Sequence, residues 1–285
     1  MRLTVLSCVV LTAALSVLYG CRTESVRRAA LVPGLEPSQR TGQPIGDSAA
    51  EISAGTSSLV TLRPPSERSG SNAGVAVPRV QSSGDARLRV TEDLDLGLVW
   101  DTGLASGAFK VRDDQPDPDH GNVFGGGVSF HYSVPTAEPN FRLGVAGQLS
   151  IYSIPWVEYR TCVAACAGDP FTRVNRSRSR TAVLGLAAIP SYELNEQVTL
   201  FSGITLRNHP YVPRESVEVG QESDSKLRAG PFNPIVSVGL EYTLPLGLGP
   251  RLQVMVDQPF RNEPVRYGPS LGARITIPFA AAAPE

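Results

Sequence analysis

The sequence comprises 285 residues, of which 19% are charged and 7% aromatic, and its formal net charge is −1. So balanced a charge excludes the basic surface typical of nucleic-acid-binding proteins, and the three histidines, His120, His131 and His209, are too few for an elaborate histidine metal site. The 27 glycines and 24 prolines favour β-structure and loops over helical bundles, and we expect no cofactor and no metal ion.

The N-terminus has the features of an export signal. Arg2 supplies a positive charge, and the apolar stretch from Leu3 to Leu18 is shorter than a comfortable membrane span. The stretch ends in Leu18-Tyr19-Gly20-Cys21, which resembles the bacterial lipobox. The sequence therefore predicts a lipoprotein signal peptide over residues 1–20. An ordinary secretory peptide with a chance cysteine is the alternative, and both predict export.

The lipobox resemblance implies that Cys21 becomes the acylated first residue of the mature chain, carrying palmitate or similar chains. Arg22 would then occupy the second position, in place of the aspartate associated with retention in the inner membrane. The resemblance thus implies lipid anchoring in the outer membrane. Several acyl chains are needed for such an anchor, because one chain binds a membrane only marginally.

The segment after Cys21 is poor in core-forming residues. Between Arg22 and Asp85 there is no Phe, Tyr or Trp, and Ser, Ala, Gly, Pro and Arg dominate. Such a composition buries too little apolar surface to offset the entropy of the chain. We expect residues 21–85 to form a lipid-anchored, disordered periplasmic linker.

Apolar and polar residues alternate from Arg87 to Phe279, in runs that include some of about ten residues, the length of a tilted membrane-spanning strand. The eight predicted strands lie within 87–100, 124–134, 141–151, 182–188, 198–206, 236–244, 252–256 and 271–279. Long connections at 103–122, 154–179 and 208–233 alternate with short ones at 136–139, 193–196 and 246–249. Short periplasmic turns and long external loops are typical of outer-membrane barrels.

The aromatic residues of the apolar face support the same assignment. Those beside the short turns or the C-terminus are Tyr132, Phe141, Tyr192, Tyr242 and Phe279. Trp100 and Phe124 fall at the opposite rim, as in the two aromatic girdles of a membrane barrel. A soluble β-barrel or sandwich in a periplasmic lipoprotein, with its apolar face inward, is the alternative, and it gives no reason for this sorting.

On these grounds residues 86–280 resemble the small eight-stranded outer-membrane barrels of the OmpA/OmpX type, and 281–285 form a tail. The last run, from Ser270 through Gly272 to Phe279, resembles the C-terminal assembly signal of such proteins. The resemblance implies an all-β, up-and-down, antiparallel transmembrane β-barrel that follows a disordered tether. The expected interior is a salt-bridged polar filling, with inward charges at Asp95, Arg142, Arg207, Glu241, Asp257 and Arg274.

Two cysteines remain after Cys8 leaves with the signal peptide and Cys21 takes lipid. Cys162 and Cys166 lie four residues apart in a loop exposed to an oxidising compartment, and we expect them to form a disulfide. A zinc site would need further ligands nearby in the sequence. A redox-active pair would need an activating helix N-terminus, which this loop lacks.

Two motifs suggest catalysis. Gly268-Pro269-Ser270-Leu271-Gly272 fits G-x-S-x-G but opens a strand with no helix behind it, so it lacks the required elbow. His131-Tyr132-Ser133 is similar to the His-x-Ser pair of outer-membrane lipid A deacylases, but Val134 stands where these enzymes carry asparagine. His131 is also expected at the periplasmic end of the lumen, away from outer-leaflet lipid. We therefore expect no catalytic residues, with a lipid A hydrolase as the alternative.

Two predicted external loops carry opposite charges. Asp113, Asp114, Asp117 and Asp119 could bind calcium, and Arg173, Arg176, Arg178 and Arg180 could bind lipopolysaccharide phosphates. The simpler interpretation is that both loops are solvated and attract each other. We expect a monomeric, non-enzymatic barrel with a structural, adhesive or surface-binding role. Its expected partners are outer-membrane lipids, lipopolysaccharide or an envelope protein, and not nucleic acid.

Overall fold

The structure is a computed structural model that describes residues 23–34, 41–45, 48–63, 75–110, 121–162, 172–211, 217–218, 227–247, 249–260 and 266–280. Every regular element in these residues is a β-strand, which confirms the all-β class. None of the described residues belongs to a helix long and apolar enough to cross a membrane.

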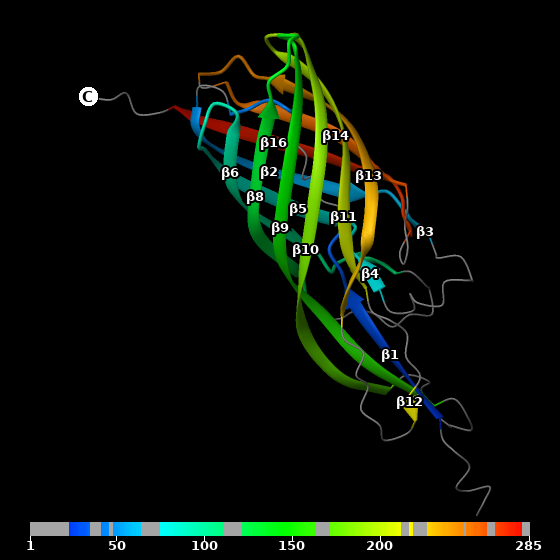
Figure 1. The fold of residues 1–285 in the computed structure, drawn as a ribbon. Helices are drawn as coiled ribbons and strands as arrows, with labels where there is room; N and C mark the ends of the chain where they lie inside the picture. The colour runs from blue at the N-terminus through cyan, green and yellow to red at the C-terminus, as the bar shows by residue number, and fades with distance from the viewer. Residues whose placement is uncertain are drawn as a thin grey trace, which may run out of the picture.

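Ten strands close into an antiparallel barrel (Figure 1). In ring order they are β2 (Ser48–Leu59), β5 (Val80–Arg89), β6 (Leu94–Gly103), β8 (Val123–Val134), β9 (Phe141–Cys162), β10 (Thr172–Asn195), β11 (Val198–Tyr211), β13 (Arg228–Thr243), β14 (Arg251–Pro259) and β16 (Ser270–Ala280). Each strand pairs with the next, and β16 pairs with β2 to close the ring, with Phe279 opposite Ala50.

The prediction of eight strands is wrong. Seven of the predicted runs correspond to single strands of the ring, but the first, 87–100, is divided between β5 and β6 by the turn at 90–93. The two additional strands are β2 and β5. All of β2 and residues 80–85 of β5 lie within residues 21–85, which were expected to be a disordered linker, so the barrel begins at Ser48 rather than residue 86. The outward positions of β2 hold Ala50, Ile52, Ala54, Thr56 and Ser58. These small side chains give β2 too weak an apolar periodicity to be recognised.

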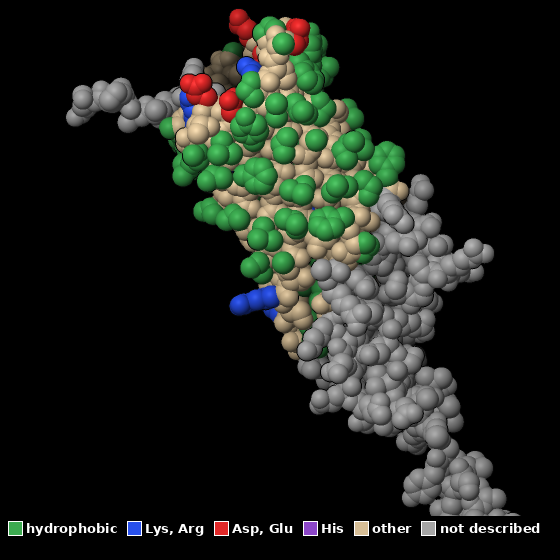
Figure 2. Space-filling view, viewed as in Figure 1, with side chains coloured by type: hydrophobic (Ala, Val, Ile, Leu, Met, Phe, Trp, Pro, Cys, Tyr) green, Lys and Arg blue, Asp and Glu red, His purple; other side chains and the backbone are tan. Residues whose placement is uncertain are grey.

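The outer face of the barrel is apolar and the inner face polar. Along β6 and β8 the outward side chains include Leu96, Leu98, Val128 and Phe130, all exposed, whereas Asp95 and His131 point inward and are buried. The space-filling view shows hydrophobic side chains covering the wall as a belt (Figure 2). A soluble barrel would have the opposite arrangement, so the architecture is that of an outer-membrane β-barrel.

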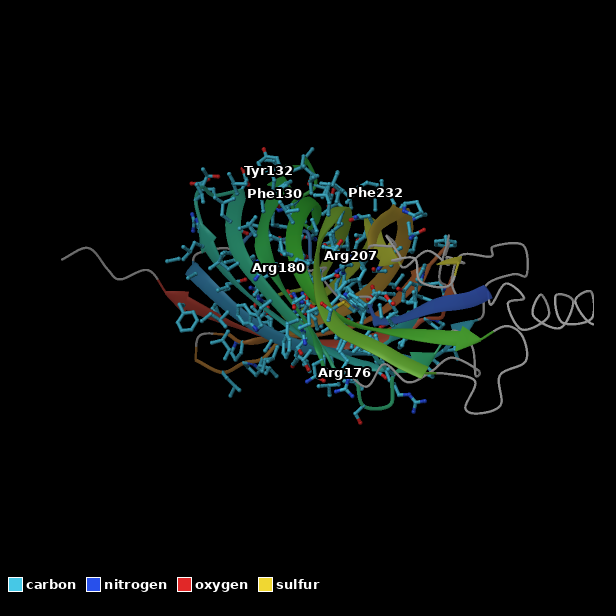
Figure 3. The ribbon with its side chains drawn as sticks, turned by 90° about the horizontal axis from the view of Figure 1, so that it is seen from below. Phe130, Tyr132, Arg176, Arg180, Arg207 and Phe232 are labelled. Carbon is cyan, nitrogen blue, oxygen red and sulfur yellow. The ribbon has the colours of Figure 1, made fainter. Side chains whose placement is uncertain are left out.

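Aromatic side chains mark both edges of this belt. Strand pairing brings Tyr132, Phe141, Tyr192, Tyr242 and Phe279 to the end of the barrel with the short turns, as predicted. Phe232 joins Trp100 and Phe124 near the opposite end, and Phe130, Tyr132 and Phe232 lie on the outside of the ring (Figure 3). Phe232 and Tyr242 are ten residues apart on β13. At about 3.3 Å per residue and a tilt of about 40°, they are separated by about 25 Å along the barrel axis, the height of a membrane-spanning belt.

The connections distinguish the two ends of the barrel. Residues 90–93, 135–140, 196–197 and 244–250 form short connections at one end, which we call the turn end, where β2 begins and β16 ends. The opposite end, the loop end, carries the longer connections 60–79, 104–122, 163–171, 212–227 and 260–269. The predicted alternation of short and long connections is confirmed. In outer-membrane barrels the short turns face the periplasm.

At the loop end a second sheet continues from the barrel wall. Strands β9 and β10 remain paired beyond Ser153, the last β9 residue that contacts β8, as far as Arg160 opposite Thr172. The free edge of β9 is then taken by β1 (Thr23–Leu31). Beside β1 lie β4 (Val75–Val77) and β12 (Val217–Glu218), and β7 (Phe109–Lys110) pairs with β4. The name extension is used below for this sheet, which consists of β1, β4, β7, β12 and the paired ends of β9 and β10. Two further short strands, β3 (Leu62–Arg63) and β15 (Arg266–Tyr267), pair with each other in a separate sheet.

Candidate functional site in the lumen and at the loop end

A buried cluster of charged side chains crosses the lumen near the turn end. The Arg87 guanidinium donates to Glu51 Oε2 at 2.9 Å and to Asp95 Oδ2 at 3.4 Å. Arg251 pairs with the same Glu51 carboxylate, and His131 Nδ1 lies 3.6 Å from the same Asp95 oxygen. Buried charges are tolerated only when they are paired, so this cluster ties five strands together through their inward side chains.

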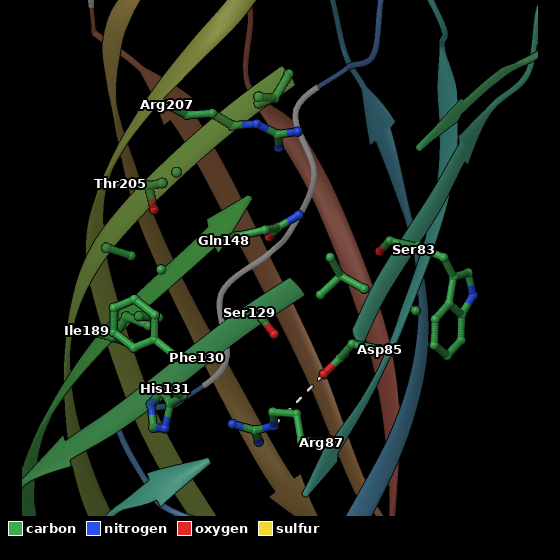
Figure 4. A pocket seen from close by; sticks show the side chains of 18 of the residues that line it. Ser83, Asp85, Arg87, Ser129, Phe130, His131, Gln148, Ile189, Thr205 and Arg207 are labelled. Atoms are coloured by element: carbon green, nitrogen blue, oxygen red, sulfur yellow. Dashed lines mark ion pairs between the residues drawn. The ribbon is translucent and has the colours of Figure 1, made fainter. Parts of the chain in front are cut away.

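A second ion pair lies one layer further along the lumen. Arg274 Nη1 is 3.2 Å from Asp85 Oδ1, and the Ser53 hydroxyl donates to the same oxygen. Arg87 Nε lies 3.9 Å from the other Asp85 oxygen, and this contact joins the two layers (Figure 4). The predicted salt-bridged interior is thereby confirmed for Asp95 and Arg274.

Toward the loop end, a polar chain is centred on Tyr152. Its hydroxyl donates to Asp101 Oδ2 at 2.5 Å and accepts from Arg207 Nη2 at 2.7 Å. Gln81 Nε2 donates to the other Asp101 oxygen at 3.3 Å. Gly125 has no side chain to occupy the space filled by the Tyr152 ring, since a Cβ atom there would overlap that ring. Every member of this chain is therefore fixed by a neighbour.

Two stretches of the chain between β1 and β2 contact the inside of the barrel wall. The Gly34 amide donates to Gln81 Oε1 at 2.7 Å, at the loop end of the lumen. The Gly42 amide donates to Ser191 Oγ at 2.5 Å, near the turn end. Leu31, Val32 and Ile45 on either side are buried. Described residues from the N-terminal segment thus contact the lumenal wall near both of its ends.

The space between these side chains is small. A cavity of about 60 Å³ lies between Asp85, Arg87, His131, Gln148 and Arg207 (Figure 4). This volume has room for a few water molecules. Buried side chains and the contacts of Gly34 and Gly42 occupy much of the lumen around this cavity.

His131 and Ser133 both face the lumen at the turn end, where 4% and 0% of their surfaces are exposed. The carboxylate nearest to His131 is Asp95, at the distance given above. The imidazole is therefore paired with a carboxylate inside the lumen, at the end away from the loops, and Ser133 follows two residues later on the same face of β8. This placement agrees with the predicted polar-core role of His131.

The predicted loop arginines form a row on the outer face of β10. Arg176, Arg178 and Arg180 occupy alternate, exposed positions that continue the line of Ala182 and Leu184 beyond the apolar belt. Figure 3 labels Arg176 on this strand, away from the ring. The row is part of a paired strand and not of an irregular loop, because Arg176, Arg178 and Arg180 lie opposite Val157, Pro155 and Ser153 of β9.

Neutral groups hold Arg178 in place. Its Nε donates to Ser153 Oγ at 2.9 Å, and its Nη2 donates to the Asn122 carbonyl oxygen at 2.8 Å. Its guanidinium carbon lies 5.6 Å from the centre of the Phe124 ring, a cation–π contact at the rim of the belt. Ser153, Asn122 and Phe124 carry no charge, so they orient the guanidinium without neutralising it.

Several predicted features lie outside the described residues. Cys21, Cys166 and the acidic residues Asp113, Asp114, Asp117 and Asp119 belong to this group, as do the side chains of Cys162 and Arg173. Lipidation, the disulfide and calcium binding therefore remain predictions. Within the part of the chain that the structure describes, no three His, Cys, Asp or Glu side chains are grouped as metal ligands.

Sequence reasoning missed the occupied lumen. Gly34 and Gly42 are the signal that could have indicated it, because glycine suits positions where the chain passes close to other atoms, the Gln81 side chain at Gly34 and backbone at Gly42. A Cβ atom on Gly42 would lie 2.5 Å from the Ile189 carbonyl oxygen and 2.7 Å from the Gly144 amide nitrogen. In a segment rich in glycine, however, two such positions cannot be distinguished from linker residues.

The sequence matches no protein-family model and no curated protein. Among solved structures, the chain is similar to the N-terminal β-barrel domain of Pseudomonas aeruginosa OprF, with 11% identity, a TM-score of 0.33 and coverage of 81% of this chain and 98% of that one. The translocator domain of autotransporter NalP from Neisseria meningitidis gives 9% identity, a TM-score of 0.40 and 98% coverage of both chains. The COG4313 outer membrane channel from Pseudomonas putida F1 gives 12% identity and a TM-score of 0.41, with coverage of 86% of this chain and 100% of that one. Similarity this low does not transfer a function.

Proposed function

We propose that the protein is a non-enzymatic outer-membrane lipoprotein with a closed barrel, whose loop end binds phosphate-bearing lipid headgroups of the cell surface, lipopolysaccharide above all. One observation carries the proposal: the row of Arg176, Arg178 and Arg180 faces outward directly beyond the apolar belt. In a membrane, that level is occupied by lipid headgroups.

The chemistry of the row suits phosphate. An arginine guanidinium presents a planar set of donors that can hold a phosphate through two parallel hydrogen bonds. On a strand, alternate residues lie about 6.6 Å apart, so neighbouring arginines can contact separate oxygens of one phosphorylated headgroup. Phe124 lies within the belt beside Arg178 and would contact the adjoining acyl region.

Binding can be measured with the full-length barrel in detergent micelles, titrated with purified lipopolysaccharide. Replacing Arg178 and Arg180 by Gln should weaken binding about tenfold or more, since the loss of 1.4 kcal/mol corresponds to a factor of ten. The control is Arg89→Gln with Arg142→Gln, which removes the same charge from strand positions that face the lumen near the turn end. Vesicles of anionic phospholipid distinguish a general phosphate site from one that prefers lipopolysaccharide. Equal affinity of both double variants would contradict the proposal.

A closed barrel also has an electrical consequence. The buried ion pairs of Arg87 and Arg274, together with Gly34 and Gly42 inside the ring, occupy the path that ions would take. We expect the purified protein to give no stable conductance steps in planar lipid bilayers. Regular steps of uniform size would favour a channel instead.

The lipoprotein part of the proposal rests on the lipobox at Cys21. Metabolic labelling with palmitate should mark the wild-type protein and not Cys21→Ser. The non-enzymatic part is tested separately, because His131→Ala should leave the acylation of envelope lipid A unchanged. A change in lipid A acylation would favour the alternative, a lipid A hydrolase.

A further inference from the structure

The N-terminal segment changes sides along the barrel. Residues Glu24–Ala30 of β1 pair with Trp156–Cys162 of β9, in the extension at the loop end. The segment then runs through the buried residues Leu31 and Val32 into the lumen. After Ile45 the chain starts β2 at Ser48, at the turn end. The strands on either side of this segment, β1 and β2, therefore place its two ends at opposite ends of the same barrel.

The length of the connection leaves only one route. Gly34 is bonded to Gln81 at the loop end and Gly42 to Ser191 near the turn end, and both wall residues are buried in the lumen. Eight residue steps extend over at most about 29 Å. This length suffices to cross the belt, about 25 Å high, along the lumen. It does not suffice to leave the barrel, pass around the wall and enter again from the other end.

We infer that the N-terminal segment is threaded through its own barrel and emerges at the cell surface, where it supplies the strand that completes the extension. The surface location rests on the proposed function and on the orientation that it implies, whereas the threading rests on the contacts of Gly34 and Gly42. It replaces a periplasmic tether with a segment that fills the lumen and forms part of the external sheet.

Strand β1 has a specific role in that sheet. Beyond Ser153, β9 is no longer paired with β8, and its backbone on that side pairs with β1 instead. Without β1, this edge would present unpaired amide and carbonyl groups to solvent. Ala29 lies opposite Val157, which in turn lies opposite Arg176, so β1 and the arginine row are separated by one strand. The threaded segment thus supports the strand pair that carries the proposed binding row.

The threading has a consequence for the predicted acyl group. Cys21 precedes Thr23 by two residues and can lie at most about 7 Å from it. Thr23 pairs with Glu218 in the extension. The lipid predicted at Cys21 would therefore be carried to the outside of the cell and not remain at the inner surface of the outer membrane.

The first experiment tests threading independently of orientation. Purified, folded Gly34→Cys with Gln81→Cys is treated with dibromobimane, which becomes fluorescent when it bridges two nearby thiols, in a Cys162→Ser, Cys166→Ser background. Removing the Gln81 amide also frees the space that a side chain at residue 34 needs. Bridging is expected for this pair and not for Gly34→Cys with Gln258→Cys, which is exposed on the outer face of β14. No bridging between residues 34 and 81 in the folded barrel would overturn the threading.

The second experiment tests the side of the membrane. Single cysteines at Glu24 and Ser25, two successive positions of β1, are treated on intact cells with a membrane-impermeant maleimide in the same background. Leu104→Cys at the loop end and Leu246→Cys at the turn end are the controls, since both positions are exposed. We expect labelling of Leu104→Cys and of at least one β1 variant, and labelling of Leu246→Cys only after permeabilisation. If the β1 variants behave like Leu246→Cys, the surface location is overturned. If Leu104→Cys also behaves so, the proposed orientation fails while the threading, tested by bridging, stands.

Discussion

Gly42 and Gly144 meet backbone to backbone inside the barrel. A Cβ atom on Gly144 would lie 2.7 Å from Gly42 Cα and 2.8 Å from His131 Nε2. Gly144 belongs to the wall strand β9, and Gly42 belongs to the threaded segment. The contact therefore fits the segment against the wall at the turn end, where the Gly42 amide also reaches Ser191.

We predict that Gly144→Val destabilises the folded barrel by about 1–3 kcal/mol, because a side chain forced into this contact overpacks it. The measurement is urea unfolding in detergent micelles, followed by the fluorescence of Trp100 and Trp156. Gly185→Val is the matched control: this glycine also faces the lumen, but a Cβ atom there meets only Arg207 Cγ, at 4.0 Å. Equal stability of the two variants would show that the segment does not press against β9.

Much of the fold could be predicted because lipid imposes a strong pattern. Each of the eight recognised strands carries large apolar side chains at its outward positions, as Leu240 and Val238 do on β13. The strands β2 and β5 were not recognised from the sequence because outward residues such as Ala54, Ser58 and Gly84 provide little apolar surface. Gly84 is covered by the Trp100 indole from β6, so the wall is apolar there through a cross-strand neighbour that no local pattern reveals.

The site could be predicted only in part. Alternation places Arg207 and Arg274 inward, but their partners Tyr152 and Asp85 come from distant parts of the sequence. Asp85 was assigned to the linker, and so half of the central ion pair was missing from the prediction. The extension was beyond prediction for the same reason, since it depends on β1, a segment without aromatic residues.

Arg87 provides a test of the turn-end cluster. It pairs with Glu51 and Asp95, both completely buried, so its removal leaves their charges without this partner. Arg87→Met should cost about 3–5 kcal/mol, the range for breaking a buried ion pair. The same substitution at the exposed Arg180 should change stability by less than about 0.5 kcal/mol. Urea unfolding compares the two, and an equally small effect for Arg87→Met would mean that the cluster does not stabilise the barrel.

Tyr152→Phe tests the chain of hydrogen bonds at the loop end, and it changes the shape of the side chain very little. The hydroxyl that bridges Asp101 and Arg207 disappears, and two buried charged groups each lose a hydrogen bond. We expect a loss of about 1–3 kcal/mol in unfolding free energy. Tyr132→Phe, on the outer face near the turn end, serves as the control and should be close to wild type. Should both variants unfold at the same urea concentration as the wild type, the Tyr152 hydroxyl would have no structural role.

The membrane assignment predicts a strong dependence on depth for charges on the outer face. Val128 is exposed midway along β8 between Phe124 and Tyr132, so its side chain should lie near the middle of the bilayer. A lysine there should cost about 2–4 kcal/mol, whereas at the exposed Leu246 of a turn it should cost about 0–1 kcal/mol. The measurement is the free energy of folding into phospholipid vesicles for Val128→Lys and Leu246→Lys. A barrel whose outer face is bathed in water would tolerate both substitutions equally, since an exposed lysine at either position would remain hydrated.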